Sequence, residues 1–268
     1  MAVRPDADPG ADPASAGHPD PGEPTPAHPA KPPVPVKAPA PGRHAPFVVD
    51  PRATLVYRGT RWLFTSLMRL WFRPVVSGPG RVPETGPVIL APVHRSFADF
   101  GFTPFVTERK LFFMTKDSMW SSRFLGWLLL HLGAFPVHRE SADREALARA
   151  EEVLARGQVL VLFPEGTRQS GDEVTELLEG AAYLAAKTGA TVVPLGIGGT
   201  AEAMPKGSKI PKRLRIQLVV GEPLAPPARR ATGRVSRRAV REATSELRAA
   251  IQSVYDEARR RFAAGATD

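Results

Sequence analysis

The 268-residue chain contains no cysteine and few histidines. Without a thiol, the chain has no cysteine nucleophile, no thiolate metal ligand and no disulfide. Of the 6 histidines, only His94, His131 and His138 lie in the part expected to fold, and their spacing is not that of a metal-binding pair. We therefore expect no metal site and no metal cofactor.

The first 46 residues lack Phe, Tyr, Trp, Leu and Ile, and they hold 14 of the 29 prolines. Such a segment cannot bury enough apolar surface to offset the entropy lost on ordering. We predict a disordered, proline-rich tail over residues 1–46, partly in the polyproline II conformation. The tail also lacks the apolar region of a secretory signal peptide.

Long apolar runs are also scarce. A charge-free apolar stretch over residues 124–137 has 14 residues and contains His131 and Gly133. A helix that crosses a bilayer takes roughly 20 residues. We therefore expect a protein that lies on a membrane without crossing it.

Residues 54–73 show helical periodicity and define an amphipathic segment that we place at residues 47–80. The apolar face carries Val56, Leu63, Leu67, Leu70 and Trp71, and the polar face carries Arg58, Arg61, Thr65 and Arg69. Tryptophan rings and arginines suit the interface of a membrane, where guanidinium groups meet lipid phosphate. The alternative is an ordinary amphipathic helix packed on its own domain.

The charge is uneven along the chain. The net charge is +9, and because the tail carries −1, residues 47–268 carry +10. A basic excess favours an anionic partner, such as a phospholipid surface, a phosphorylated substrate or an acidic carrier protein. It is also compatible with a basic surface that has no special partner. We expect no nucleic-acid partner, because no recognised binding motif accompanies the charge.

From residue 81 onward, short apolar runs alternate with helical segments. The runs predict strands at residues 88–93, 111–115, 134–137, 159–163, 192–197 and 215–220. Helices are predicted at residues 143–156, 174–188 and 236–262. This alternation predicts an α/β core over residues 81–227, with a mainly parallel central sheet flanked by helices, and a basic C-terminal helix over residues 228–268.

The segment "APVHRSFADFG", residues 91–101, places His94 directly after a predicted strand and Asp99 five residues later. In α/β proteins, sites gather at loops that follow the carboxyl ends of strands. The two side chains can meet only if His94 lies in the turn and Asp99 in the first turn of the next helix. The carboxylate would then fix the histidine tautomer and leave the other ring nitrogen free as a base. A capping Asp with a surface His is the alternative.

A second segment, "FPEGTR" at residues 163–168, follows another predicted strand. Gly166 allows a close approach of backbone to a ligand or a positive φ angle. Arg168 offers a planar fork for phosphate, Thr167 offers a hydroxyl, and Glu165 can pair with a cation or hold a hydroxyl. The segment is a candidate anion site, or else a turn with a solvated arginine.

These two blocks, "HRSFAD" and "FPEGTR" about 65 residues apart, resemble the glycerolipid acyltransferase family that includes 1-acylglycerol-3-phosphate acyltransferases. The block "GAFPVHR" matches a further family pattern in part, through Gly133, Val137 and Arg139, and Val193-Pro194 resembles a fourth. The resemblance spans about residues 54–225. It implies transfer of a fatty acyl group from acyl-CoA or acyl-carrier protein to the hydroxyl of a phosphorylated glycerolipid acceptor, with no other cofactor.

The resemblance also implies roles for individual residues. His94 is expected as the general base and Asp99 as the residue that polarises it. Substrate binding, above all of the acceptor phosphate, is expected of the following residues: Glu165, Gly166, Thr167, Arg168, Arg139, Lys116 and Arg95. Arg95 bears on the acceptor, because "HRS" is seen more in glycerol-3-phosphate acyltransferases than in lysophosphatidate enzymes.

Several hypotheses about function stay open at this point. The first is acylation of 1-acylglycerol-3-phosphate to phosphatidate in phospholipid biosynthesis. Alternatives are the same chemistry on glycerol-3-phosphate, another lysophospholipid or a glycolipid, a thioesterase-like hydrolysis, and a basic membrane-binding module without turnover. We expect peripheral, monotopic attachment to the cytoplasmic face of the plasma membrane through an anionic surface.

Overall fold

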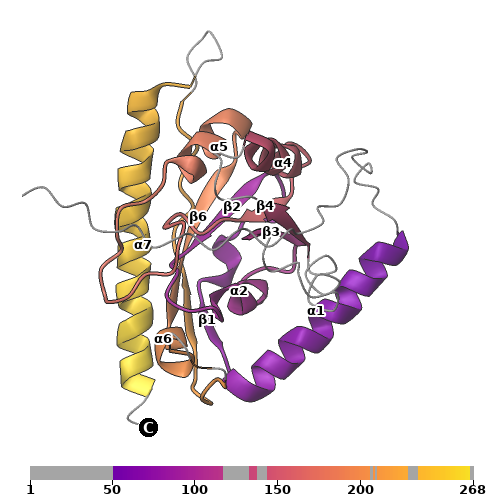
Figure 1. The fold of residues 1–268 in the computed structure, drawn as a ribbon, viewed down its shortest axis with the longest axis vertical. Helices are drawn as coiled ribbons and strands as arrows, with labels where there is room; N and C mark the ends of the chain where they lie inside the picture. Colours follow the sequence, from indigo (N-terminus) through magenta and orange to yellow (C-terminus); the bar gives the residue numbers. More distant parts are fainter. Residues whose placement is uncertain are drawn as a thin grey trace, which may run out of the picture. The chain divides into compact units, whose positions relative to one another are not determined.

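The structure is a computed structural model that describes residues 51–116, 133–137, 144–205, 208, 210–228 and 235–265 (Figure 1). These residues belong to one compact unit, which runs from His44 to Asp268. The tail predicted at residues 1–46, most of the apolar stretch at 124–137, and Arg139 lie outside the described residues.

Within the described residues, seven strands form one sheet in the order β1-β7-β6-β2-β5-β3-β4. The strands are β1 Val75–Ser77, β2 Val88–Pro92, β3 Leu111–Lys116, β4 Ala134–Val137, β5 Val159–Val161, β6 Thr191–Gly198 and β7 Gln217–Val220. Strands β2 to β6 are mutually parallel, β7 is antiparallel to β6, and β1 is parallel to β7. The mainly parallel sheet is therefore confirmed, while β1 was not predicted.

The middle of the sheet holds the hydrophobic core. Strand β2 lies between β5 and β6, with Ile89 paired to Leu160 on one side and to Val192 on the other. Every residue of β2 is buried. A strand covered on both faces must be apolar throughout, which is why its sequence reads as an unbroken apolar run.

The helices agree with the sequence pattern in most places. The described helices are α1 Pro51–Phe72, η1 Pro79–Arg81, α2 Asp99–Phe102, η2 Thr103–Phe105, α4 Arg144–Ala155, α5 Gly180–Thr188, α6 Thr200–Ala203 and α7 Arg237–Gly265. Helix α5 ends at Gly189, whose φ of 73° lets its N–H bond to the carbonyl of Ala185. The sequence predicted this end of the helix.

The start of the same helix was predicted wrongly. A helix was expected from residue 174, but residues 174–179 are irregular. The Val174 N–H donates to the Gln252 side chain at 2.6 Å, and the Leu178 N–H donates to the Pro164 carbonyl at 2.9 Å. Because distant groups hold these amides, the segment does not form the helical i to i−4 bonds.

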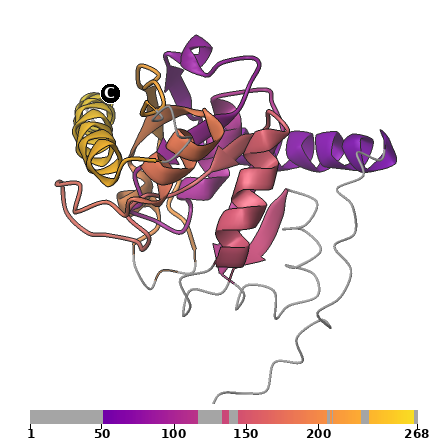
Figure 2. The same ribbon diagram turned by 90° about the horizontal axis from the view of Figure 1, so that it is seen from above.

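Helix α7 packs closely on β6. Figure 2 shows α7 nearly end-on beside the sheet. A Cβ atom added to Gly196 would lie 2.1 Å from the Val254 carbonyl oxygen, and one added to Gly198 would lie 2.4 Å from that of Ala258. Only glycine permits this backbone approach, so these two positions set the place of α7 against the sheet.

Helix α1 meets the domain through a side that carries both polar and apolar residues, Arg61 among them. Arg61 is buried, and its guanidinium donates to the carbonyls of Pro104 and Arg109, each at 2.8 Å, and to that of Thr107. The prediction that Arg61 faces lipid phosphate is therefore wrong, because the turn at residues 104–109 presents carbonyls that this side chain satisfies. Tyr57 and Phe72 are buried on the same side of the helix.

The apolar face of α1 is exposed. Leu63 is 55% exposed, Leu67 57% and Leu70 70%. Trp62 and Trp71 are also exposed, at 70% and 45%. A helix that packed on its own domain through its apolar stripe would hide these side chains. Among the described residues, no helix combines the length and the apolar character needed to cross a membrane.

Candidate active site

His94 and Asp99 meet at the carboxyl end of β2. His94 lies in the turn two residues after the strand, and Asp99 is the first residue of α2. Their side chains are joined by a 3.0 Å contact between His94 Nδ1 and Asp99 Oδ2. This is the arrangement that the five-residue spacing required. An ionised Asp99 can only accept, so Nδ1 carries the proton and the Nε2 lone pair is left for another partner.

The Asp99 carboxylate is held firmly in place. Asp99 is fully buried, and Oδ2 also accepts the N–H groups of Arg95 and Ser96, each at 2.7 Å. Oδ1 is buried and has no hydrogen-bond partner among the described residues. One oxygen therefore carries three contacts, which orients the carboxylate toward the imidazole.

The "FPEGTR" segment lies beside this pair. Strand β5 is the parallel neighbour of β2, so both blocks leave the sheet at the same edge. The Phe163 ring packs against the His94 ring, with centroids 4.2 Å apart. The Gln169 N–H donates to the His94 carbonyl at 2.9 Å. The turn therefore contacts both the ring and the backbone of His94.

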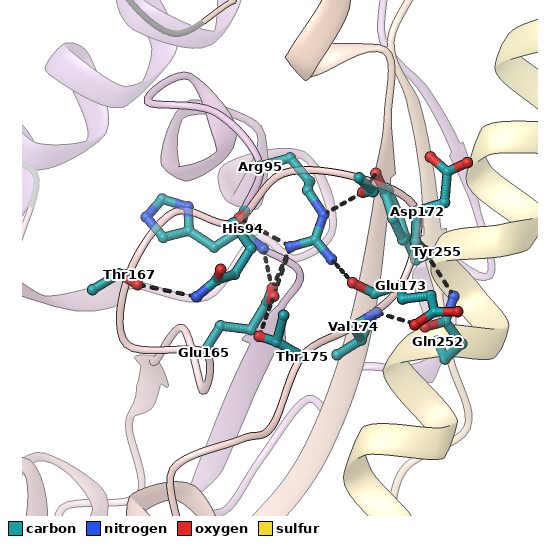
Figure 3. A network of polar contacts seen from close by, with 12 residues as sticks. His94, Arg95, Glu165, Thr167, Asp172, Glu173, Val174, Thr175, Gln252 and Tyr255 are labelled. Atoms are coloured by element: carbon teal, nitrogen blue, oxygen red, sulfur yellow. Dashed lines mark hydrogen bonds and ion pairs between the residues drawn. The ribbon is translucent and has the colours of Figure 1, made fainter. Parts of the chain in front are cut away.

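Glu165 and Arg95 form a buried ion pair behind the turn (Figure 3). Arg95 Nη1 lies 2.6 Å from Glu165 Oε2 and 2.9 Å from Oε1, and the side chains are 2% and 0% exposed. Glu165 Oε1 also accepts the backbone N–H of His94 at 2.8 Å. The sequence left open whether Glu165 pairs with a cation or holds a hydroxyl. In the structure it pairs with a cation, the Arg95 guanidinium.

Arg95 makes its remaining contacts with protein groups. Its Nε donates to the Gly171 carbonyl at 3.1 Å and its Nη2 to the Glu173 carbonyl at 2.9 Å. The guanidinium lies over the ring of Tyr255, with Cζ 4.9 Å from the centroid. A side chain so buried and so fully occupied is not placed to touch a substrate, although the sequence suggested that role for Arg95 and Glu165.

The surroundings of Arg168 differ from those of Arg95. It is exposed, as is Thr167, and no described residue bonds to its guanidinium. Gly166 precedes this pair with a φ of 71°, and its N–H bonds to the Phe163 carbonyl at 3.1 Å. The positive φ turns the chain sharply and projects residues 167 and 168 outward. The turn therefore presents an exposed guanidinium near the His94–Asp99 pair.

Two predicted residues are described in part or not at all. Lys116 is the last residue of β3, where its backbone is opposite Val137 of β4. Since β3 is parallel to β2 and β5, Lys116 lies at the same edge of the sheet as His94. The Lys116 side chain and all of Arg139 lie outside the described residues.

The sequence did not point to the residues that surround the Arg95 side chain and the segment that it contacts. Gly171, Glu173, Gln252 and Tyr255 all belong to the network in Figure 3. They follow no motif and are separated from His94 by 77 residues or more, so no local pattern pointed to them. The described residues also contain no group of three or more His, Asp or Glu side chains that could hold a metal ion.

An α/β fold with a His–Asp pair and an exposed arginine at one sheet edge is an arrangement that can transfer a proton beside a bound anion. Comparison with known proteins agrees with such a site. A family model described as Acyltransferase matches residues 73–198. Residues 73–198 are therefore similar to the acyltransferase family, which the two sequence blocks also resemble.

Several curated relatives are similar to this chain. It is 29% identical over 153 residues to 1-acyl-sn-glycerol-3-phosphate acyltransferase LPAT1, chloroplastic, of Arabidopsis thaliana, which covers 56% of this chain and 43% of that protein. It is 27% identical over 148 residues to the 1-acyl-sn-glycerol-3-phosphate acyltransferase of Bacillus subtilis, which covers 53% and 69%. The match spans 50% of a relative from Chlamydomonas reinhardtii. The chain thus spans about half the length of the first relatives that it matches.

A solved structure shares the fold. The 1-acyl-sn-glycerophosphate (LPA) acyltransferase PlsC from Thermotoga maritima superposes with a TM-score of 0.59 at 24% identity. The superposition covers 78% of this chain and 83% of that chain. The family-model match ends at residue 198, so β7 and α7 lie beyond it.

Proposed function

We propose that this chain transfers a fatty acyl group from an acyl thioester to the free hydroxyl of 1-acylglycerol-3-phosphate, giving phosphatidate. The observation that carries the proposal is the 3.0 Å bond between His94 Nδ1 and Asp99 Oδ2. It supplies an oriented base beside the exposed Arg168. The names of the relatives from Arabidopsis and Bacillus support lysophosphatidate as the acceptor.

The proposed mechanism moves one proton. His94 Nε2 accepts the proton of the acceptor hydroxyl as its oxygen attacks the thioester carbonyl. The buried Asp99 carboxylate stabilises the imidazolium that forms. When the tetrahedral intermediate collapses, the carbon–sulfur bond breaks and His94 returns the proton to the departing thiolate. The products are an ester and a free thiol, and no acyl-enzyme is needed.

Arg168 is proposed to bind the acceptor phosphate. Its guanidinium is exposed, and a planar guanidinium binds phosphate through two parallel hydrogen bonds. Thr167 stands exposed beside it, and Gly166 makes the turn that presents both. Lys116 and Arg139 stay proposed contributors to acceptor binding.

Arg95 does not favour glycerol-3-phosphate as the alternative acceptor. That alternative rested on the arginine that follows the histidine, because the sequence suggested that Arg95 contacts the substrate. In the structure the Arg95 side chain is 2% exposed and paired with Glu165. Arg95 therefore does not contact the acceptor directly. It can affect the acceptor only by positioning His94 and the turn at residues 163–168. We therefore place lysophosphatidate first.

The exposed face of α1 supports a peripheral attachment to membrane. Trp62, Leu67 and Leu70 present indole and leucine side chains to the outside, as interfacial helices do. On its other side α1 reaches α2, where Phe64 and Met68 pack near Gly101, two residues after Asp99. A helix lying on the bilayer would thus hold the active site close to a lipid acceptor. The cytoplasmic face of the plasma membrane stays a prediction from the sequence.

The proposal is tested by incubating purified full-length protein with labelled acyl-CoA or acyl-carrier protein. The acceptors are lysophosphatidate, glycerol-3-phosphate, other lysophospholipids, a glycolipid, and water alone. We expect the fastest ester formation with lysophosphatidate. Faster transfer to another acceptor, or hydrolysis alone, would contradict the proposal. His94→Ala serves as the control for contaminating activity.

A further inference from the structure

We propose that Tyr255 of α7 is a positioning residue of the active site, which acts on His94 and Asp99 through Arg95. The inference rests on the proposed function and deepens it, because it assigns part of the C-terminal helix to the catalytic site. Tyr255 lies beyond residues 73–198, the part that matches the family model.

The Tyr255 ring contacts the guanidinium that joins the two sequence blocks. Arg95 Cζ lies 4.9 Å from the ring centroid, within the range of a cation–π contact. The Tyr255 hydroxyl donates to the Gly171 carbonyl at 3.4 Å, and the same carbonyl accepts Arg95 Nε at 3.1 Å. Burial raises the pKa of the Tyr255 phenol, so the phenol keeps the proton that it donates. The ring therefore confines the Arg95 guanidinium, while the hydroxyl adds only a long bond to the same carbonyl.

Arg95 transmits this constraint in two directions. Its side chain pairs with Glu165, whose Oε1 accepts the His94 N–H at 2.8 Å. Its backbone N–H donates to Asp99 Oδ2 at 2.7 Å, the same oxygen that contacts His94 Nδ1. A shift of Arg95 would therefore displace the backbone of the histidine and loosen the carboxylate that orients its ring.

Helix α7 also holds the loop on which Arg95 rests. One turn before Tyr255, Gln252 accepts the Val174 N–H at 2.6 Å and donates to the Asp172 carbonyl at 3.0 Å. Arg259, one turn after Tyr255, pairs with the Asp172 carboxylate at 2.6 Å. Figure 3 shows the Gln252 side chain of α7 bonded to the segment at residues 171–175. Two carbonyls of that segment, those of Gly171 and Glu173, accept hydrogen bonds from the Arg95 guanidinium.

Around Tyr255, the backbone of α7 packs directly against β6. Val254 and Ala258, which flank Tyr255, are the residues whose carbonyls approach Gly196 and Gly198 of β6. A helix docked so tightly places the Tyr255 ring within narrow limits. The sheet that carries His94 and the helix that carries Tyr255 thus form one rigid support.

The experiment compares three variants of the full-length protein in the acyl-transfer assay. Tyr255→Leu removes the ring, and we expect kcat to fall at least tenfold while the KM values for donor and acceptor stay within about twofold. Tyr255→Phe keeps the ring, and kcat should stay within about twofold. Tyr57→Leu is the matched control, because Tyr57 is buried to a similar extent and its ring contacts Lys110, whose Nζ lies 5.2 Å from the ring centroid, instead of Arg95.

The expected pattern separates positioning from stability. Tyr255→Leu and Tyr57→Leu should both lower the melting temperature, but only Tyr255→Leu should lower kcat. An unchanged kcat in Tyr255→Leu would overturn the proposal, and so would an equal loss of kcat in Tyr57→Leu. Loss of kcat in Tyr255→Phe would contradict the role given to the ring.

A second measurement needs no turnover. The proton on His94 Nδ1, identified in the NMR spectrum by its loss in His94→Ala, reports the bond to Asp99 directly. We expect this resonance to persist in Tyr255→Phe and Tyr57→Leu and to broaden or disappear in Tyr255→Leu. Persistence in Tyr255→Leu would overturn the inference. If the wild-type protein transfers no acyl group, the proposed function fails, while this resonance still decides the role of Tyr255.

Discussion

Arg95 and Glu165 lie 70 positions apart in the sequence, yet Arg95 Nη1 is 2.6 Å from Glu165 Oε2 in the interior of the protein. Arg95 follows the catalytic histidine candidate, and Glu165 belongs to the turn that presents Arg168. This ion pair therefore sets the distance between the proposed base and the proposed phosphate site. It joins the two sequence blocks into one structural unit.

Breaking this pair should destabilise the protein strongly. Glu165→Gln leaves the buried guanidinium of Arg95 without its counter-charge, and the expected loss in the free energy of unfolding is about 3–5 kcal/mol. Urea denaturation followed by circular dichroism measures it. Glu151→Gln, which breaks a surface pair with Lys187, should cost less than about 1 kcal/mol. Similar losses in the two variants would contradict the structural role of the buried pair.

His94→Ala should abolish acyl transfer without unfolding the protein. The side chain is 16% exposed, so its removal leaves some buried surface unfilled, but the backbone bonds of residue 94 to Glu165 and Gln169 remain. Loss of a general base typically lowers rates about 10²–10⁴-fold. The measurement is kcat with labelled acyl donor, alongside the melting temperature. Substantial transfer by a folded His94→Ala protein would end the general-base assignment.

Arg168→Ala should weaken binding of the acceptor. Because the guanidinium is proposed to contact the acceptor phosphate, KM for lysophosphatidate should rise about tenfold or more, while KM for the acyl donor stays within about twofold. Steady-state kinetics with each substrate varied in turn provides the test. Arg238→Ala removes an exposed arginine from α7 and should change neither KM. Equal increases in both KM values of Arg168→Ala would count against the assignment.

Membrane binding should depend on the exposed face of α1. The triple variant Trp62→Ser, Leu67→Ser, Leu70→Ser should sediment with anionic liposomes several-fold less than the wild-type protein, because the apolar contact with the bilayer is lost. Binding of the wild-type protein should also fall as salt rises, since exposed arginines such as Arg58 and Arg69 contribute charge. Ile210→Ser, which changes an exposed apolar side chain elsewhere, is the control. Undiminished binding of the triple variant would contradict the proposal.

Much of the fold was predictable because the pattern is local. The apolar run of β2 is buried from Val88 to Pro92, and Gly189 ends α5 in the left-handed conformation that its sequence position indicated. The three-residue strand β1 escaped prediction, because so short a strand leaves no periodicity to detect. The antiparallel pairing of β7 with β6 was also beyond the pattern, since strand direction depends on the path of the connecting chain.

Segments whose amides bond to distant residues were predicted less well. Residues 174–179 have a composition that permits a helix, but Gln252 and Pro164 hold their amides in an irregular path. In α1, periodicity grouped apolar side chains that are exposed, yet on the predicted polar face Arg61 is buried while Arg58 and Arg69 are exposed. Arg61 is buried because it donates to carbonyls at residues 104–109. The position of those carbonyls depends on the tertiary fold and cannot be read from the helix sequence.

The amino-acid sequence by itself determined the chemistry available at the site: a histidine and an aspartate after one strand, and a glycine-bearing turn with an arginine after another. Those features depend on residue type and on short spacing along the chain. Only the tertiary structure decided which arginine is exposed and which is buried. Arg95 and Arg168 have the same side chain, and the sheet directs one toward Glu165 and Tyr255 and leaves the other exposed. Burial and pairing arise from contacts between distant segments, so no local pattern encodes them.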